Sequence, residues 1–291
     1  MNKLTSILLA VVIAVVASYA TVKFVGGASS ATQATIKESA YERIKRTGVI
    51  RCGYAAAQPF LVKDPNTGKP SGIAYEIMEE LGKALSLKID WAEEVGWSSF
   101  PSSLISGRID AFCVGAWPSA ARAREVDVTM PFSFRPYYAY ARMDDSRFDN
   151  NVAAINDPSV TVSVMDGDTS DIVARNDFPA AKILALPELS NSAEMFENVM
   201  AKKADVTLIG PAGFAAFDAA NPNKIKRIPL AVPLRVFGNV FFIARGQDEL
   251  RQMLNIALGE LISSGRVEKI IARHEKVPGT ILRTAKPYLE Q

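Results

Sequence analysis

The chain alternates short apolar runs with amphipathic segments, and no other feature of the sequence constrains its fold as strongly. In the first half, the runs 49–54, 87–95 and 109–116 predict strands, and the segments 72–85 and 100–106 predict helices. Strands that alternate with helices form a parallel sheet with helices on its faces. The sequence therefore predicts an α/β fold.

The same alternation returns in the second half of the chain. Strands are predicted at 160–165, 182–186 and 205–209, and helices at 169–175 and 190–203. The length of 291 residues also exceeds what one small core requires. Together, the length and the repeated pattern predict two lobes of the same α/β type.

Two extended aromatic segments, 137–142 and 236–243, lie between the halves and after the second half. Their composition predicts strands, which would cross between the lobes. The segment 248–274 places leucines on one helical face, with a break at Gly265, and we expect it to pack on the first lobe. The predicted bounds are 29–140 for lobe 1, with 237–291 returning to it, and 141–236 for lobe 2.

The N-terminal segment carries an uncharged apolar run at residues 4–22, which is about the length that crosses a hydrocarbon core. Small residues at Ser18 and Ala20 fit a signal-peptide cleavage site, but the run is longer than the core of a typical signal peptide. A cleaved signal peptide and an uncleaved membrane anchor at residues 1–28 therefore both remain open. Either one would place the rest of the chain outside the cytoplasm.

The charge balance and the scarcity of metal-binding residues exclude several classes of function. The 33 Lys and Arg residues against 31 Asp and Glu residues leave a net charge of +2, which is too even for the basic surface that duplex nucleic acid requires. A single histidine and two cysteines exclude a four-thiolate zinc site and most histidine-based catalysis. We therefore expect no nucleic-acid partner, no metal and no cofactor.

The two cysteines, Cys52 and Cys113, both lie in short apolar runs. An exported chain meets an oxidising compartment, in which a disulfide between them could form. Two buried free cysteines in the core are an equally supported alternative. The sequence leaves the choice between these two states open.

Four segments carry motifs in a characteristic order: 50–60, 96–111, 122–132 and 203–206. The most specific is the run Gly107-Arg108-Ile109-Asp110-Ala111 followed by Arg122. Together, over residues 40–276, they resemble the periplasmic solute-binding proteins of polar amino-acid ABC transporters, the family 3 type. The resemblance implies a two-lobed periplasmic-binding-protein fold with two hinge strands that closes over a ligand, here preceded by an N-terminal hydrophobic helix.

The resemblance also implies roles for individual residues. In the family, the arginine at the position of Arg122 grips the ligand's carboxylate, for which a guanidinium offers a bidentate fork. Trp97 lies where the family places an aromatic wall, and the turn with Asp166 and Thr169 begins a helix that approaches the carboxylate. Each of these ligand roles has an alternative. Asp168 or Thr169 could simply cap the helix, and Arg122 could be a surface residue.

Three departures from the family pattern concern the ligand. Gly210 stands where the family places an aspartate for the ligand's ammonium, and Gly115 and Trp117 replace hydroxyl residues that help to hold the carboxylate. The first-lobe loop lacks an aromatic cover, which Tyr54 or Trp117 could supply. A buried ammonium without an acidic partner is costly. Either Asp166 or another acid therefore replaces the missing aspartate, or the ligand has no α-amino group.

The leading hypothesis is a non-catalytic, monomeric periplasmic protein that captures a small carboxylate-bearing solute, an amino acid or related organic acid, for ABC-type uptake. Its partner would be an inner-membrane ABC permease or a sensor, and residues 4–22 would tether it if they are not removed. One alternative is an exported dehydratase-like enzyme on the same fold, with Asp166 or Glu188 as its acid. The other is a membrane-tethered sensory domain that binds a partner protein.

Overall fold

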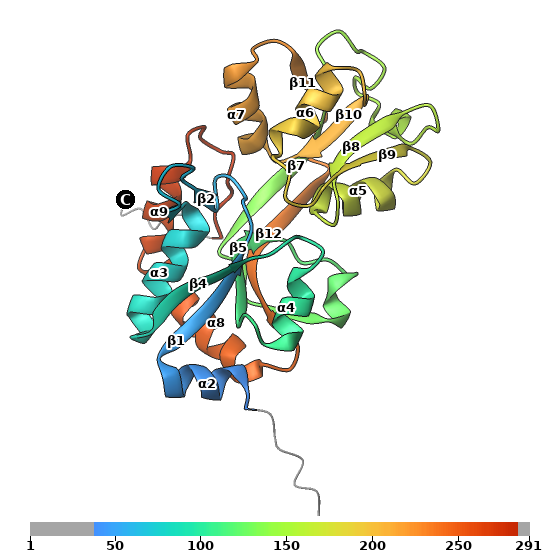
Figure 1. The fold of residues 1–291 in the computed structure, drawn as a ribbon. Coiled ribbons are helices and arrows are strands. Elements are labelled where there is room, and N and C mark those ends of the chain that lie inside the picture. Colours follow the sequence, from blue (N-terminus) through green and yellow to red (C-terminus); the bar gives the residue numbers. More distant parts are fainter. Residues whose placement is uncertain (1–37, 285–291) are drawn as a thin grey trace, which may run out of the picture. The chain divides into compact units, whose positions relative to one another are not determined.

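The computed structural model describes residues 38–284 (Figure 1). The predicted signal peptide or anchor at 1–28, with its hydrophobic helix, lies outside the described residues. Among the helices within 38–284, none combines the length and the hydrophobicity that a membrane span requires.

Ten strands form one mixed sheet in the order β4-β1-β5-β12-β7-β10-β8-β9, with β6 paired to β12 and β11 to β7. The strands are β1 (Val49–Tyr54), β4 (Lys88–Glu94), β5 (Ala111–Ala116), β6 (Val126–Val128), β7 (Ser133–Arg142), β8 (Thr161–Met165), β9 (Lys182–Leu186), β10 (Val206–Ile209), β11 (Ile225–Arg227) and β12 (Arg235–Ala244). In the first half, β1 runs parallel to β4 and β5, and in the second half β8 runs parallel to β9 and β10.

The long strands β7 and β12 join the two parallel halves. They pair antiparallel with each other, and β12 continues onto β5 while β7 continues onto β10. Each strand therefore passes from one half of the sheet to the other, so the two halves form two lobes with two hinge strands. The predicted two-lobed α/β fold is confirmed, whereas the predicted lobe bounds at 140 and 237 stay predictions.

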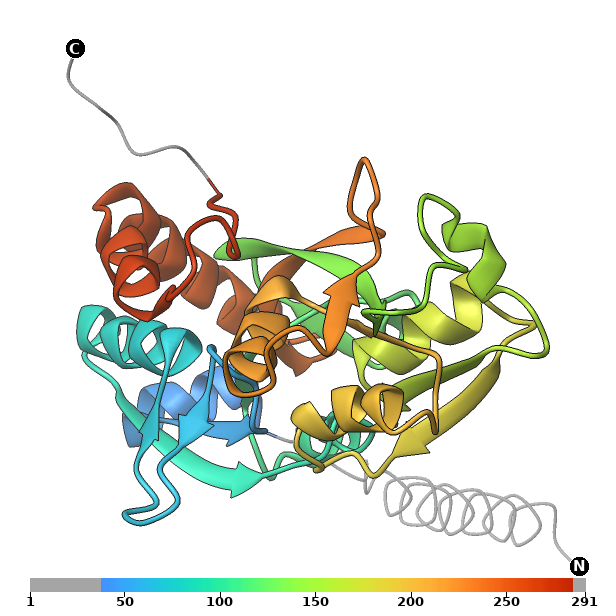
Figure 2. The ribbon, with the colours of Figure 1, turned by 90° about the horizontal axis from the view of Figure 1, so that it is seen from above.

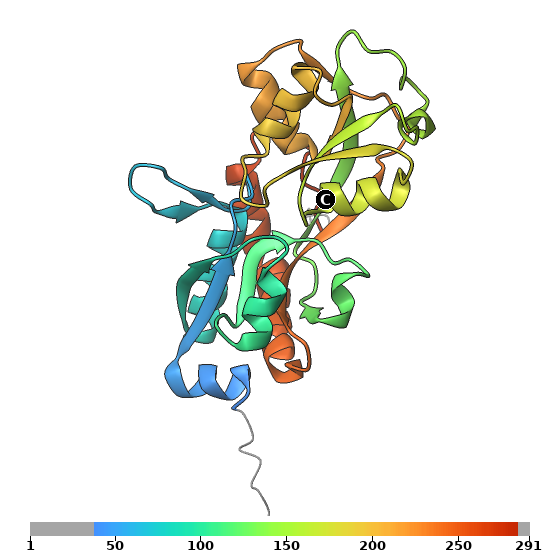
Figure 3. The same ribbon diagram turned by 45° about the vertical axis from the view of Figure 1, so that its right-hand side comes forward.

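Helices cover both halves of the sheet (Figure 1). The first-lobe helices are α2 (Ala40–Thr47), α3 (Ile73–Leu85), α4 (Phe100–Ser106), α8 (Asp248–Ser263) and α9 (Arg266–His274). The second-lobe helices are α5 (Thr169–Asp177), α6 (Ala193–Met200) and α7 (Pro211–Ala220). A short hairpin of β2 (Val62–Lys63) and β3 (Pro70–Ser71) extends away from the first lobe (Figure 3).

The core of the first lobe explains why the C-terminal helices return to it. Buried Ile77 and Leu81 of α3 share one hydrophobic cluster with Leu254 and Leu258 of α8 and with Ile270 of α9. Burial of such a side chain stabilises the fold by roughly 1.5–3 kcal/mol. Figure 2 shows α9 beside α3.

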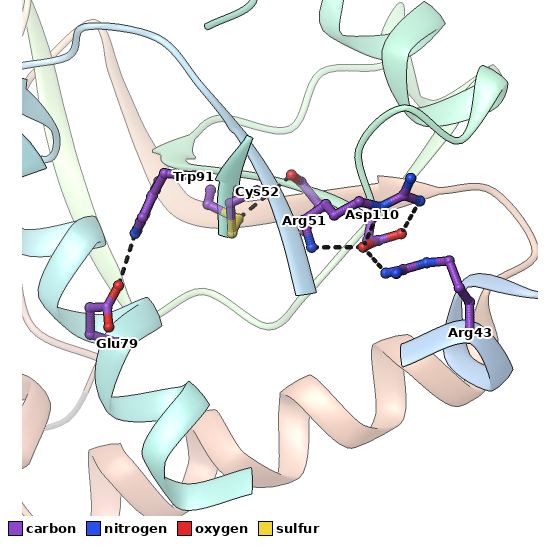
Figure 4. The surroundings of a disulfide bond; sticks show 8 residues. Arg43, Arg51, Cys52, Glu79, Trp91 and Asp110 are labelled. Atoms are coloured by element: carbon purple, nitrogen blue, oxygen red, sulfur yellow. Dashed lines mark hydrogen bonds and ion pairs between the residues drawn. A yellow bond between two sulfur atoms is a disulfide. The ribbon is translucent and has the colours of Figure 1, made fainter. Parts of the chain in front are cut away.

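Two features fasten the middle of the first-lobe sheet (Figure 4). A disulfide joins Cys52 on β1 to Cys113 on β5, with the two Cα atoms 5.6 Å apart, and both side chains are fully buried. Beside it, the buried carboxylate of Asp110 pairs with Arg43 and accepts hydrogen bonds from the Arg51 side chain at 2.8 Å and the Arg51 backbone N–H at 2.7 Å. These contacts tie α2, β1 and β5 together.

A second charged cluster lies where β7 ends, and it makes the second lobe sensitive to acid. Buried Asp145 accepts hydrogen bonds from Arg147 Nη2 at 2.7 Å and Arg142 Nη2 at 3.1 Å. The bond from Arg147 is the main reason that the pKa of Asp145 is lowered from 3.8. The pKa of Asp145 is lower in the folded state than in the unfolded state. Its stabilisation is therefore complete above the unfolded-state pKa and is lost as the pH falls through the folded-state pKa.

We therefore expect Asp145→Asn to lower the free energy of unfolding at pH 7 by about 2 kcal/mol, the range for hydrogen bonds to charged groups. The variant should also lose less stability than the wild type between pH 5 and pH 2. Denaturant unfolding at a series of pH values measures both effects. Asp144→Asn is the matched control, because its side chain is 78% exposed and lies 3.9 Å from Arg142. Equal losses in the two variants would contradict the assignment.

Candidate ligand-binding site

A cavity of about 350 Å³ lies where the two lobes meet beside the hinge strands. This volume is at the lower end of the range for small-molecule sites, about 300–1,000 Å³, and suits a solute of amino-acid size. The first lobe and β7 contribute Ala56, Ala57, Gln58, Leu61, Val62, Lys63, Trp97, Ala116, Trp117, Arg122, Arg135 and Tyr137. The second lobe contributes Met165, Asp168, Thr169, Leu189, Ser190, Asn191, Ser192, Met195, Ile209, Gly210, Ala212 and Gly213.

Arg122 lies in the short 3-10 turn that follows β5, and its guanidinium bridges the lobes. Its Nη2 donates hydrogen bonds to the carbonyl of Trp97 at 3.1 Å and to the carbonyl of Gly167, and its Nη1 lies 3.5 Å from the carbonyl of Trp117. Gly167 belongs to the second lobe, in the turn between β8 and α5. Arg122 therefore holds a second-lobe backbone group as well as facing the cavity.

The charge of Arg122 is poorly solvated in this position. The residue is only 9% exposed, and burial lowers the pKa of its guanidinium, while attraction to Asp168 acts in the opposite direction. Arginine nevertheless stays protonated at neutral pH. The bonds to carbonyl dipoles compensate this cation only in part, so an anion in the cavity would stabilise it further.

A second arginine, Arg135 on β7, faces the same cavity. Its guanidinium carbon lies 4.3 Å from the ring centre of Phe60 and 4.5 Å from that of Trp117. Burial lowers the pKa of Arg135 to about 10, although Tyr137 and Asp168 counteract this effect. Sequence analysis missed this residue, because the hinge strand was predicted to begin at Tyr137 whereas β7 begins at Ser133.

Asp168 is the one acidic residue among the described residues that line the cavity. It caps α5, since its side chain accepts hydrogen bonds from the backbone N–H and the hydroxyl of Ser170. Burial raises the pKa of Asp168, and the bonds from Ser170 and the attraction of Arg122 oppose that shift. Three cationic side chains also line the cavity, those of Lys63, Arg122 and Arg135. The cavity is therefore positive on balance and favours an anion.

The N-terminus of α7 also opens onto the cavity. Gly210 caps this helix without a side chain, and Gly210, Ala212 and Gly213 all line the cavity wall. The backbone N–H groups of a first helical turn attract negative charge. Within residues 38–284, in contrast, no group of three or more His, Cys, Asp or Glu side chains could hold a metal ion.

Further contacts between the lobes close one side of the cavity. Ser98 of the first lobe donates from its backbone N–H at 2.9 Å and from its hydroxyl to the carboxylate of Glu188 in the second lobe. Glu188 lies directly over Gly96, so that a Cβ added there would clash with the carboxyl group. The structure is therefore in a state in which the two lobes touch at the rim.

The model of the bacterial extracellular solute-binding proteins, family 3, matches residues 50–276. The chain belongs to this family. The match confirms the resemblance inferred from the four sequence segments. Comparison with curated protein sequences gave no match.

Solved structures share the fold of this family 3 protein. An ancestral amino-acid-binding protein, a precursor of cyclohexadienyl dehydratase, is 24% identical with a TM-score of 0.70, over 82% of this chain and 100% of that one. The solute receptor for L-cysteine of Neisseria gonorrhoeae is 21% identical with a TM-score of 0.69, over 84% and 98%. The substrate-binding protein of an amino-acid ABC transporter is 21% identical with a TM-score of 0.67, over 79% and 100%. At these identities the likeness shows the fold alone.

Membership of the family indicates the general kind of ligand, location and partner of this protein. Its members are extracellular proteins that bind solutes, so the family implies a small-molecule ligand, a location outside the cytoplasm and, in general, an ABC permease as partner. The family and these solved neighbours are binding proteins rather than enzymes.

The structure brings most of the residues predicted for the site to one place in this family 3 protein. Trp97, Trp117, Arg122, Thr169 and Gly210 all line the cavity. Trp117 is held firmly, because its Nε1 donates to Asn239 at 3.1 Å and its ring stacks on Phe237. The predicted residues from both lobes thus meet beside the hinge strands.

Two other predicted residues lie outside the cavity wall. Tyr54, at the end of β1, packs edge-on against Trp91 of the neighbouring strand, with ring centres 6.2 Å apart. Asp166 is exposed, because Gly167 at φ 68° turns the chain so that Asp168 faces the cavity instead. Glu188, predicted as an acid for the enzyme alternative, is bound at the rim by Ser98 and does not line the cavity.

Proposed function

We propose that this family 3 protein is a monomer that captures a small carboxylate-bearing solute between its lobes for uptake by an inner-membrane ABC permease. The observation that carries the proposal is the cavity itself, into which two arginines and one acid project from both lobes. The family match and the solved neighbours, which include an amino-acid ABC transporter protein, support it.

Arg122 is the proposed carboxylate-binding residue. In the present state both hydrogens of its Nη2 are directed at carbonyl oxygens, those of Trp97 and Gly167. A ligand carboxylate would replace the Gly167 carbonyl, because a carboxylate carries a full opposite charge and can accept two parallel hydrogen bonds from a guanidinium. Thr169 and the first turn of α5 would face the same carboxylate.

The proposed location is the periplasm, with residues 1–28 as signal peptide or inner-membrane anchor. This proposal follows from the extracellular character of the family and from the apolar run at 4–22. Neither of the acids named for the enzyme alternative, Asp166 and Glu188, lines the cavity, and Asp168, which does, is held as the cap of α5 by hydrogen bonds from Ser170. This arrangement supports a binding role without turnover.

A thermal-shift screen of the full chain tests the proposal. The panel contains amino acids, hydroxy acids, keto acids and cyclic carboxylates, each beside its uncharged amide. At a 100-fold excess over Kd, a ligand that binds only the folded state adds about 2.7 kcal/mol, which raises the midpoint by about 5–10 °C for a chain of this size. We expect this shift from at least one acid and not from its amide. No shift by any acid, or equal shifts by acid and amide, would overturn the proposal.

The rim contact gives a further prediction. Glu188→Ala removes the hydrogen bonds to Ser98 that hold the lobes together, so the closed state should be less populated and affinity should fall about 5- to 10-fold, or roughly 1 kcal/mol. Isothermal titration with the acid that gives the largest thermal shift measures the change. Glu197→Ala is the control, because Glu197 is exposed on α6. Unchanged affinity in Glu188→Ala would contradict a role in closure.

A further inference from the structure

Arg135 has an unusual environment for a cation. Its guanidinium lies between the rings of Phe60 and Trp117, and its Nε is buried without a hydrogen-bond partner. Among residues 38–284, no acidic side chain forms an ion pair with it. An aromatic face attracts a cation, but it does not accept the directed hydrogen bonds that a guanidinium can donate.

The contrast with Arg122 is informative. Arg122 donates to three backbone carbonyls from its two terminal nitrogens, whereas Arg135 forms no hydrogen bond with the described residues. A desolvated charge is retained in a protein where an opposite charge meets it in the working state. Because Arg135 lines the cavity, the ligand is the group that can supply this charge.

Gly210 lies beside Arg135 in the cavity wall. Gly210 has no side chain, and a Cβ placed there would meet nothing closer than the carbonyl of Pro136 at 3.6 Å and Cδ of Arg135 at 4.0 Å. Gly210 and Ala212 belong to the N-terminal turn of α7, whose N–H groups favour an anion. An acidic group in the cavity beside Gly210 could therefore contact both Arg135 and this turn.

We propose that Arg135 binds a second acidic group of the ligand, so that the ligand class is a dicarboxylate, either an acidic amino acid or an organic diacid. This inference rests on the proposed function, in which Arg122 takes the first carboxylate. Arg122 then selects acids over neutral solutes, and Arg135 selects diacids over monoacids. If the diacid carries an amino group, Asp168 is the acid of the cavity wall that can face it.

Isothermal titration of the full chain with isosteric pairs tests this specificity. The pairs are glutamate and glutamine, aspartate and asparagine, and glutarate and its monoamide, in which one carboxylate is replaced by an amide of the same shape. We expect at least one diacid to bind 30-fold or more tightly than its monoamide. Equal binding of diacid and monoamide overturns the inference and leaves the proposed function intact. Failure of every acid in the thermal-shift panel, these six probes included, overturns both.

Variants of Arg135 assign the preference to this residue. In Arg135→Met the preference for the diacid should fall below about 3-fold, while affinity for the monoamide changes less than about 3-fold. Arg135→Lys should keep a part of the preference, because it keeps the charge and loses the fork. Arg227→Met is the control, since Arg227 also stacks on an aromatic ring, at 4.6 Å from that of Tyr138, but lies outside the cavity. An unchanged preference in Arg135→Met overturns the inference.

A second variant tests the same subsite with Arg135 in place. Gly210→Asp adds a carboxylate beside Arg135, where the space for a Cβ and the φ of −74° both allow it. This carboxylate should pair with Arg135 and repel the second acidic group, so the diacid preference should fall at least 10-fold. A retained preference would place the second acidic group elsewhere. The unfolding midpoint of each variant, measured without ligand, shows that the variant is folded.

Discussion

Arg122→Ala is expected to lower the affinity for the best acid of the panel at least 30-fold. The guanidinium is only 9% exposed and projects into the cavity, so its loss removes the charge and leaves the ligand carboxylate without its main partner. Truncating one member of a buried charged pair costs about 2–5 kcal/mol, which corresponds to about 30-fold or more. Isothermal titration of the two proteins measures the change directly.

Arg124→Ala is the matched control for this prediction. Arg124 lies in the same short turn, carries the same charge and is exposed. It should bind the acid within about 2-fold of the wild type. Retention of affinity by Arg122→Ala within about 3-fold would show that the bonds from Arg122 to Trp97 and Gly167 are structural, and would remove this residue from the site.

Loss of the disulfide is expected to give the largest change in stability. Cys52 and Cys113 are separated by 61 residues, and closure of a loop of that length accounts for about 4 kcal/mol in the chain-entropy description. The two cysteines also join neighbouring strands in the middle of the first-lobe sheet. The double variant Cys52→Ala with Cys113→Ala should therefore unfold at a clearly lower denaturant concentration.

Reduction of the wild type supplies the control for the disulfide. A reductant should destabilise the wild type by a similar amount and leave the double variant unchanged. Intact mass after alkylation should show no modified thiol before reduction and two after it. Two modified thiols without reduction, or a loss of stability below about 1 kcal/mol, would contradict the bridge.

The fold could be predicted largely because hydrophobic periodicity and chain order determine it. The predicted strands 49–54 and 182–186 coincide with β1 and β9, and the helix at 100–106 coincides with α4. Helix α7 was not predicted, because Gly213 within it lowers the helix propensity, although Pro211 at its first position is a favourable start. The helix forms because tertiary packing of Phe217 and its neighbours outweighs local propensity.

A site residue could be predicted from the sequence only where a recognisable motif accompanies it. Arg122 could be found because a motif precedes it, but Arg135 follows no such motif. Pro136 next to it lacks a backbone donor, which argues against a central strand, yet it pairs with Val236 in the crossing between the lobes. Strand alternation then places Arg135 and Tyr137 on one face, toward the cavity. Only the pairing of two distant strands reveals this.

The turn before α5 is a second place where the sequence alone does not identify the site residue. Asp166 and Asp168 differ by two positions, and either could face a ligand from the sequence alone. The left-handed conformation of Gly167 decides between them, since it reverses the chain and leaves Asp166 exposed. Such a conformation is permitted by glycine but is not required by it, so the sequence does not determine which acid lines the cavity.

The most direct test of the account is isothermal titration of the full chain with the best acid, followed by an NMR spectrum of the recovered solute. The account predicts one bound solute per chain, at least 100-fold weaker binding of the corresponding amide, and a solute that is chemically unchanged after prolonged incubation. Equal binding of the amide would contradict recognition of a carboxylate, and the appearance of a product would contradict a binding protein without turnover.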